Sequence, residues 1–146
     1  MVLGEPGAGK SLIARAAVSE ILRNPERIPV FTELKQYRGD LRKLLERAAP
    51  RSILGPTIPA GGDLLRRTYI LDGVDEIPQE LLAAFGVELQ TLLSTDSGAN
   101  VVMTSRQAFY VSQRAQLPQF PAVFHILDFS DDDIRDYLDR DRKSVV

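Results

Sequence analysis

The residues Gly4-Glu5-Pro6-Gly7-Ala8-Gly9-Lys10-Ser11 decide the fold of this chain. They fit the pattern G-x-x-x-x-G-K-[ST], the phosphate-binding P-loop. Glycines let the backbone curl so that successive N–H groups can point inward at an anion. Lys10 supplies a mobile positive charge for the β- and γ-phosphates, and the Ser11 hydroxyl is a hard oxygen ligand that suits Mg²⁺. We therefore predict a nucleotide-binding loop that comprises Gly4, Glu5, Pro6, Gly7, Ala8, Gly9, Lys10, Ser11 and Leu12.

The residues on either side of this loop supply the context that the motif requires. Residues 1–3 are apolar and form the end of a predicted strand, and the small and apolar residues of 12–22 predict a helix. The N-terminus of that helix would aim its dipole and its free N–H groups at the phosphates. The alternative is a chance match in a glycine-rich turn, and the strand before the loop and the helix after it count against this.

Composition and charge exclude several other classes of protein. The chain has 146 residues, 44% of them apolar, which is enough for one domain with a hydrophobic core. It has no cysteine and a single histidine, so disulfides and thiolate or histidine zinc sites are not expected. The net charge is −2 and no apolar run approaches the roughly 20 residues that span a bilayer. We expect no direct binding to nucleic acid or membrane, and the cytoplasm, where ATP and Mg²⁺ are abundant, is the default location.

Predicted strands and helices alternate along the whole chain. Strands are predicted at residues 28–34, 68–72, 101–104 and 122–127, and helices at about 9–23, 41–49, 78–94 and 107–116, with a last helix from Ser130. This alternation predicts an α/β fold with a parallel sheet. Pro29 cannot donate to a strand ladder, so its strand is expected at an edge of the sheet or to begin there.

The segment Leu71-Asp72-Gly73-Val74-Asp75-Glu76 narrows the chemistry. An acidic residue at the carboxyl end of a buried strand lies where open α/β sheets bind their ligands. Asp72 is therefore predicted to orient Mg²⁺ through water, the Walker B role. Glu76 can polarise a water for attack on the γ-phosphate, and Asp75 can share that task or hold the loop. The alternative is that these acids cap the helix that begins near Pro78.

A third polar element, Thr104-Ser105-Arg106, directly follows another buried strand. If that strand lies beside the P-loop strand, Arg106 comes close to the γ-phosphate and can stabilise its charge. The alternative is an arginine at a helix start that faces solvent. His125 is predicted to be a core or edge histidine, and the acidic run at 131–133 is predicted to mark a helix N-terminus instead of a metal cluster.

Together, the P-loop, the segment from Ile70 to Glu76 and Thr104-Ser105-Arg106 resemble the NACHT family. This family is a branch of the STAND signalling ATPases, within the additional-strand P-loop NTPases. Residues 126–138 also resemble the end of that nucleotide-binding core. The resemblance implies a three-layer sheet in the order 5-1-4-3-2, helices on both faces, and the strand from Ile28 at the edge. One departure is Gln107, where the family often has proline.

The resemblance also implies a function. Residues 1–146 would be the nucleotide-binding core, and a piece of a longer protein whose helical and winged-helix domains follow it. This core would bind ATP, or GTP, with Mg²⁺, hydrolyse it slowly, and switch between an ADP-held state and an ATP-bound state that self-associates. An AAA+ remodelling ATPase and a small-molecule or nucleotide kinase are the alternatives, together with a domain that binds nucleotide without hydrolysing it. We expect the isolated chain to be a weak NTP hydrolase.

Overall fold

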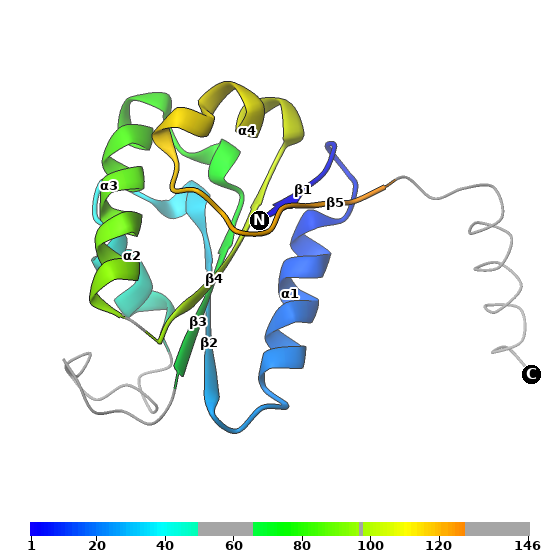
Figure 1. Ribbon diagram of the computed structural model, residues 1–146, viewed down its shortest axis with the longest axis vertical. Coiled ribbons are helices and arrows are strands. Elements are labelled where there is room, and N and C mark those ends of the chain that lie inside the picture. Colours follow the sequence, from blue (N-terminus) through cyan, green and yellow to red (C-terminus); the bar gives the residue numbers. More distant parts are fainter. Residues whose placement is uncertain (50–65, 97, 128–146) are drawn as a thin grey trace, which may run out of the picture.

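A parallel five-stranded sheet forms the centre of this computed structural model, which describes residues 1–49, 66–96 and 98–127 (Figure 1). All strand pairs are parallel, and the order across the sheet is β2-β3-β4-β1-β5. The predicted order 5-1-4-3-2 is thus confirmed, with the strand that contains Pro29 at one edge. The strands are β1 (Val2–Leu3), β2 (Arg27–Glu33), β3 (Arg66–Asp72), β4 (Asn100–Ser105) and β5 (Phe124–His125).

Helices cover both faces of this sheet, as predicted. Helix α1 lies alone on one face among the described elements, and α2, α3 and α4 lie on the other (Figure 1). The α-helices are α1 (Lys10–Ile21), α2 (Leu41–Ala48), α3 (Gln79–Thr95) and α4 (Gln107–Gln113). Short 3₁₀ turns are η1 (Leu34–Gln36), η2 (Val74–Glu76) and η3 (Arg114–Gln116). The result is the three-layer α/β fold of the P-loop NTPases.

The main core lies between the sheet and the three helices α2, α3 and α4. Tyr37 and Phe85 are fully buried there, and their rings meet edge to face at 5.4 Å between centroids. Asp40 caps α2, because its carboxylate accepts a hydrogen bond from the Lys43 backbone N–H at 2.8 Å. On α3, close packing explains the glycine at position 86, since a Cβ there would overlap the carbonyl oxygen of Gln116.

The predicted strands 28–34, 68–72, 101–104 and 122–127 all differ from the structure at one or both ends, and β2 and β5 are the two that stop earlier than predicted. Strand β2 stops at Glu33, and Leu34 instead begins the turn η1. Strand β5 has two residues instead of the predicted 122–127, and both pair with the two residues of β1. The carbonyls of Met1 and Leu3 accept from the N–H groups of Phe124 and Ile126 at 2.9 and 2.7 Å, which fixes β5 beside the start of the P-loop.

The helix predicted from Ser130 and the acidic run at 131–133 lie outside the described residues. Within the described ranges, no helix has the length and apolar character needed to cross a membrane.

Candidate nucleotide-binding site

The P-loop connects β1 to α1 and takes its shape from two glycines in the left-handed region. Gly7 has φ 81° and Gly9 has φ 84°, and Gly9 is the residue that precedes the first turn of α1. A Cβ at either position would meet no atom within 4 Å, so the requirement for glycine comes from the backbone conformation itself. The N–H of Ala8 donates to the Glu5 carbonyl at 3.1 Å, which closes the loop into a turn.

At Gly4 the constraint is limited space, not backbone conformation. A Cβ at Gly4 would lie 3.3 Å from side-chain atoms of both Ala8 and Ile126. Its N–H donates to the Ser105 carbonyl at 3.2 Å. The start of the loop is therefore held between the end of β4 and the residues after β5.

Lys10 places its ammonium group against the inside of the loop. Its Nζ donates to the carbonyls of Gly4 and Glu5 at 2.9 and 2.8 Å. Glu5 thus contributes its backbone carbonyl to this contact, and the residue itself is exposed. Leu12 lies at the outer side of the site and is 72% exposed. The lysine is in place to offer its charge to an anion bound by the loop.

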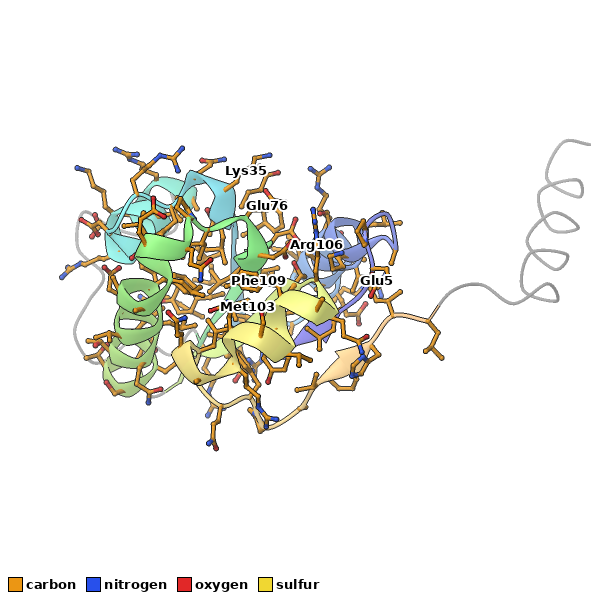
Figure 2. The ribbon with its side chains drawn as sticks, turned by 90° about the horizontal axis from the view of Figure 1, so that it is seen from above. Glu5, Lys35, Glu76, Met103, Arg106 and Phe109 are labelled. Carbon is orange, nitrogen blue, oxygen red and sulfur yellow. The ribbon has the colours of Figure 1, made fainter. Side chains whose placement is uncertain are left out.

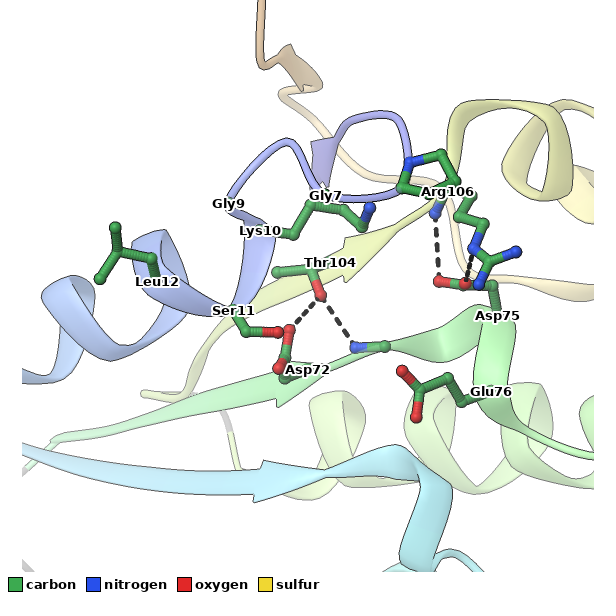
Figure 3. A pocket seen from close by; sticks show the side chains of 12 residues that line it. Gly7, Gly9, Lys10, Ser11, Leu12, Asp72, Asp75, Glu76, Thr104 and Arg106 are labelled. Carbon is green, nitrogen blue, oxygen red and sulfur yellow. Dashed lines mark hydrogen bonds and ion pairs between the residues drawn. The ribbon is translucent and has the colours of Figure 1, made fainter.

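Asp72 ends β3 and is held by a hydroxyl from the neighbouring strand (Figure 3). Thr104 Oγ1 donates to Asp72 Oδ1 at 2.6 Å and accepts from the Gly73 N–H at 2.8 Å. Figure 3 shows the side chains of Ser11 and Asp72 pointing toward each other from α1 and β3. A hydroxyl and a carboxylate are the hard oxygen donors that Mg²⁺ prefers, so this pair fits the predicted metal.

The turn after Asp72 brings Glu76 back over the end of the strand. Gly73 adopts φ 79°, and a Cβ there would lie 3.2 Å from Cδ and Oε1 of Glu76. The Glu76 residue is exposed and lines the pocket. A glycine at this position therefore serves two purposes, because it permits the left-handed turn and it leaves space for the carboxylate.

The side chain of Asp75, one residue earlier, contacts Arg106 at the start of α4 instead. Its side chain is only 7% exposed and forms an ion pair with Arg106, with Oδ2 3.0 Å from Nε. The Arg106 backbone N–H donates to Asp75 Oδ1 at 3.1 Å. The Arg106 side chain remains 56% exposed at the pocket. Asp75 is thus occupied with fixing the start of α4, which favours the loop-holding role among the two predicted for it.

These residues surround one pocket of about 350 Å³. Most of the predicted site residues line it, but Gly4, Glu5 and Ala8 do not. Its lining consists of Pro6, Gly7, Gly9, Lys10, Ser11, Leu12, Asp72, Gly73, Asp75, Glu76, Thr104 and Arg106. Thr104 was predicted only as part of the polar element Thr104-Ser105-Arg106, and its contact with Asp72 was not predicted. A hydroxyl residue at the end of a strand that adjoins the Asp72 strand was the available indication for Thr104.

A second charged group lies on the edge strand, outside the residues that line this pocket. Glu33 pairs in register with Asp72, and its carboxylate lies 2.7 Å from Lys35 Nζ and 3.7 Å from Arg15. The hydrogen bond from Lys35 is the main cause that lowers the pKa of Glu33. The same contact raises the pKa of Lys35, and the negative charges of Glu76 and Asp72 add to it. Figure 2, which views this end of the sheet, places Lys35 and Glu76 close together.

His125 lies on the exposed edge strand β5 and does not line the pocket. Of the two predicted positions, core or edge, it occupies the edge. The described residues contain no group of three or more histidine or acidic side chains that could hold a metal ion. A metal at this site would therefore depend on Ser11, Asp72 and the oxygen atoms of a bound phosphate.

Comparison with known proteins supports the fold. No protein-family model and no curated protein matches the chain. Among solved structures, the crystal structure of Cdc6p from Pyrobaculum aerophilum is similar, with a TM-score of 0.63 and 17% sequence identity. The match covers 98% of this chain and 42% of that chain, so the present sequence spans less than half of the length of Cdc6p. At this identity the likeness shows a shared fold.

Proposed function

We propose that this chain binds ATP or GTP with Mg²⁺ and hydrolyses it slowly, as the switch core of a NACHT-type signalling ATPase. The observation that carries this proposal is the meeting of three sequence elements in one pocket. The P-loop, the acidic turn after β3 and the end of β4 are far apart in the sequence, yet all three line the same 350 Å³ space. Ligands of open α/β sheets bind at this carboxyl end of the strands.

The binding residues divide into two groups. The N–H groups of the loop and the ammonium of Lys10 would hold the phosphates, because both offer positive charge within the curve of the loop. Ser11 and Asp72 would hold Mg²⁺ from the opposite side, since their oxygen atoms are the hard donors in the pocket wall. When bound, the metal would neutralise negative charge on the phosphate oxygens.

Glu76 is the proposed general base for hydrolysis. Its carboxylate lies over Gly73 and faces the pocket, whereas the carboxylate of Asp75 is already paired with Arg106. Glu76 would therefore accept a proton from the attacking water. Asp75 would keep Arg106 at the pocket wall, where its guanidinium could stabilise charge on the γ-phosphate.

The AAA+ alternative fits the fold equally well. The similarity to Cdc6p, at 17% identity, is one of fold and does not separate this alternative from the NACHT assignment. The feature that favours the NACHT assignment is local: the segment Asp72-Gly73-Val74-Asp75-Glu76, followed by Thr104-Ser105-Arg106. A kinase would need an acceptor pocket and an arginine-rich lid, and neither is evident in the described part of the chain.

The proposal includes partners beyond the nucleotide. Helical and winged-helix domains of the same protein would close over the pocket, and self-association would follow ATP binding in the cytoplasm. Residues 1–146 alone should bind nucleotide weakly and hydrolyse it slowly. Hydrolysis needs a preorganised site in which the access of water is controlled. A longer protein with downstream domains should retain ADP through purification. Turnover of several per second by residues 1–146 alone would instead favour the motor or kinase alternatives.

Binding of fluorescent ATP, ADP and GTP analogues, measured with Mg²⁺, tests the proposal directly. Lys10→Ala should weaken binding at least about tenfold, or about 1.4 kcal/mol, while circular dichroism stays unchanged. Lys43→Ala is the matched control, since Lys43 is an exposed lysine on α2 that does not line the pocket. Equal affinity of the Lys10 and Lys43 variants would reject the P-loop assignment.

A further inference from the structure

Thr104 occupies the register position next to the predicted metal ligand. Leu71 pairs with Met103 in the parallel ladder of β3 and β4, so the next residues, Asp72 and Thr104, are neighbours on the same face of the sheet. Thr104 is fully buried, and Asp72 is 8% exposed. The hydroxyl of Thr104 therefore acts on Asp72 in an environment from which water is largely excluded.

The hydrogen bonds of this hydroxyl have a defined direction. The Gly73 N–H, 2.8 Å from Thr104 Oγ1, can only donate. The hydroxyl proton must then go to Asp72 Oδ1 at 2.6 Å, because an ionised carboxylate can only accept. One oxygen of Asp72 is thus occupied, which fixes the rotation of the carboxylate and leaves Oδ2 for another partner.

We propose that Thr104 is a positioning residue for Mg²⁺, which holds Asp72 so that its second oxygen is presented to the metal. This inference rests on the proposed nucleotide-binding function. It assigns to Thr104 a contact with the carboxylate and none with the nucleotide. Partners that orient a ligating carboxylate strengthen metal binding, and their loss commonly costs tenfold to a hundredfold in metal affinity.

The same hydroxyl connects the metal side of the site to the turn that carries Glu76. Gly73 has its left-handed conformation immediately after Asp72, and its N–H is held by Thr104. Figure 3 shows both hydrogen bonds radiating from Thr104, one to the carboxylate and one to the turn. Loss of the hydroxyl would release both, whereas loss of the methyl group would release neither.

The test compares Thr104→Val with Thr104→Ser in the full chain. Valine keeps the shape of threonine and removes the hydroxyl, and serine keeps the hydroxyl and removes the methyl group. The readout is the affinity for a fluorescent ADP analogue in MgCl₂ divided by its affinity in EDTA. Thr104→Val should lower this ratio about tenfold, and Thr104→Ser should keep most of it. If Thr104→Val does not fold, Thr104→Ala carries the same expectation.

Thr68→Val is the control for loss of a buried threonine hydroxyl. Thr68 lies on the same strand as Asp72, is 3% exposed, and accepts a hydrogen bond from Arg27 at 3.3 Å, away from the pocket. Its substitution should leave the ratio unchanged. If Thr104→Val has the same ratio as wild type, the role of Thr104 is overturned, while the proposed nucleotide-binding function still stands. Absence of any nucleotide binding by wild-type protein would overturn the proposed function and this inference with it.

Discussion

Asp75 holds Arg106 through both of its carboxylate oxygens. Oδ1 accepts from the Arg106 backbone N–H at 3.1 Å, and Oδ2 lies 3.0 Å from the Arg106 Nε. One residue therefore fixes both the start of α4 and the direction in which the arginine leaves it. The adjacent Glu76 shares neither contact and faces the pocket. The fold thus gives two neighbouring acids different positions and different partners.

The first prediction separates the roles of these two acids. Glu76→Gln should leave nucleotide binding nearly intact and slow hydrolysis about a hundredfold or more, because it removes a proton acceptor needed only in the transition state. Asp75→Asn should have a smaller effect on hydrolysis, since its remaining oxygen can still accept from the Arg106 N–H. Single-turnover hydrolysis, with binding measured in parallel, gives both quantities.

The control for this experiment is a variant that changes Arg106 itself. Arg106→Gln should reduce hydrolysis, and adding Asp75→Asn to it should cost little more, because the two residues form one unit. If Glu76→Gln hydrolyses nucleotide as fast as wild type, then Asp75 or another group is the base.

The second prediction concerns the metal. Asp72→Asn should reduce the gain in nucleotide affinity that Mg²⁺ provides, because an amide oxygen is a weaker ligand for a hard cation than a carboxylate. Glu33→Gln is a matched control, since Glu33 lies at the neighbouring register position but is paired with Lys35. Titration with Mg²⁺ and EDTA measures the effect. A similar loss in both variants would mean that negative charge in general is responsible, and would argue against a specific role of Asp72 at the metal.

The third prediction concerns the packing of α3. Gly86→Ala normally stabilises a helix by about 1 kcal/mol, but here the added Cβ would overlap the Gln116 carbonyl. The backbone must shift to accept it, so we expect a net destabilisation of about 1–3 kcal/mol. Val87→Ala, at an exposed position that is the next residue along, should change stability little. Urea unfolding measures both, and a stabilised Gly86→Ala would contradict the close contact.

The fourth prediction is a pH dependence that arises from Tyr69. Burial, with a further contribution from the Asp96 carboxylate at 3.1 Å, raises the pKa of Tyr69 from 10 to about 12. Between these values the unfolded chain loses this proton and the folded chain keeps it. Stability supplied by the neutral phenol is therefore fully present below pH 10 and falls as pH rises toward 12. Tyr69→Phe should make the decrease in unfolding free energy between pH 9 and 11 shallower (roughly, one unit either side of the ordinary tyrosine pKa).

Wild-type protein measured in parallel is the reference for this experiment, because every other titrating group is retained in Tyr69→Phe. The variant should also be less stable than wild type near neutral pH, since Asp96 loses one of its hydrogen-bond donors. An identical slope in the two proteins would mean that Tyr69 does not titrate differently in the folded state.

The sequence by itself determined the order of elements and the location of the site. Glycines at positions 7 and 9 specify left-handed backbone that other residues rarely adopt, so the shape of the loop is written locally. Continuous apolar segments specify buried parallel strands, and Asp72 ends one of them. These features act over a few residues, and the P-loop and the edge strand were predictable for that reason, whereas the sheet order was implied by the resemblance to the NACHT family.

Tertiary structure decided which side chains act together. Only the register of β3 against β4 brings Thr104 beside Asp72, and only the position of α4 brings Arg106 to Asp75. Hydrogen bonds and ion pairs between strands depend on distances between residues some 30 positions apart in the sequence. No local pattern encodes those distances, because they arise when the whole sheet assembles.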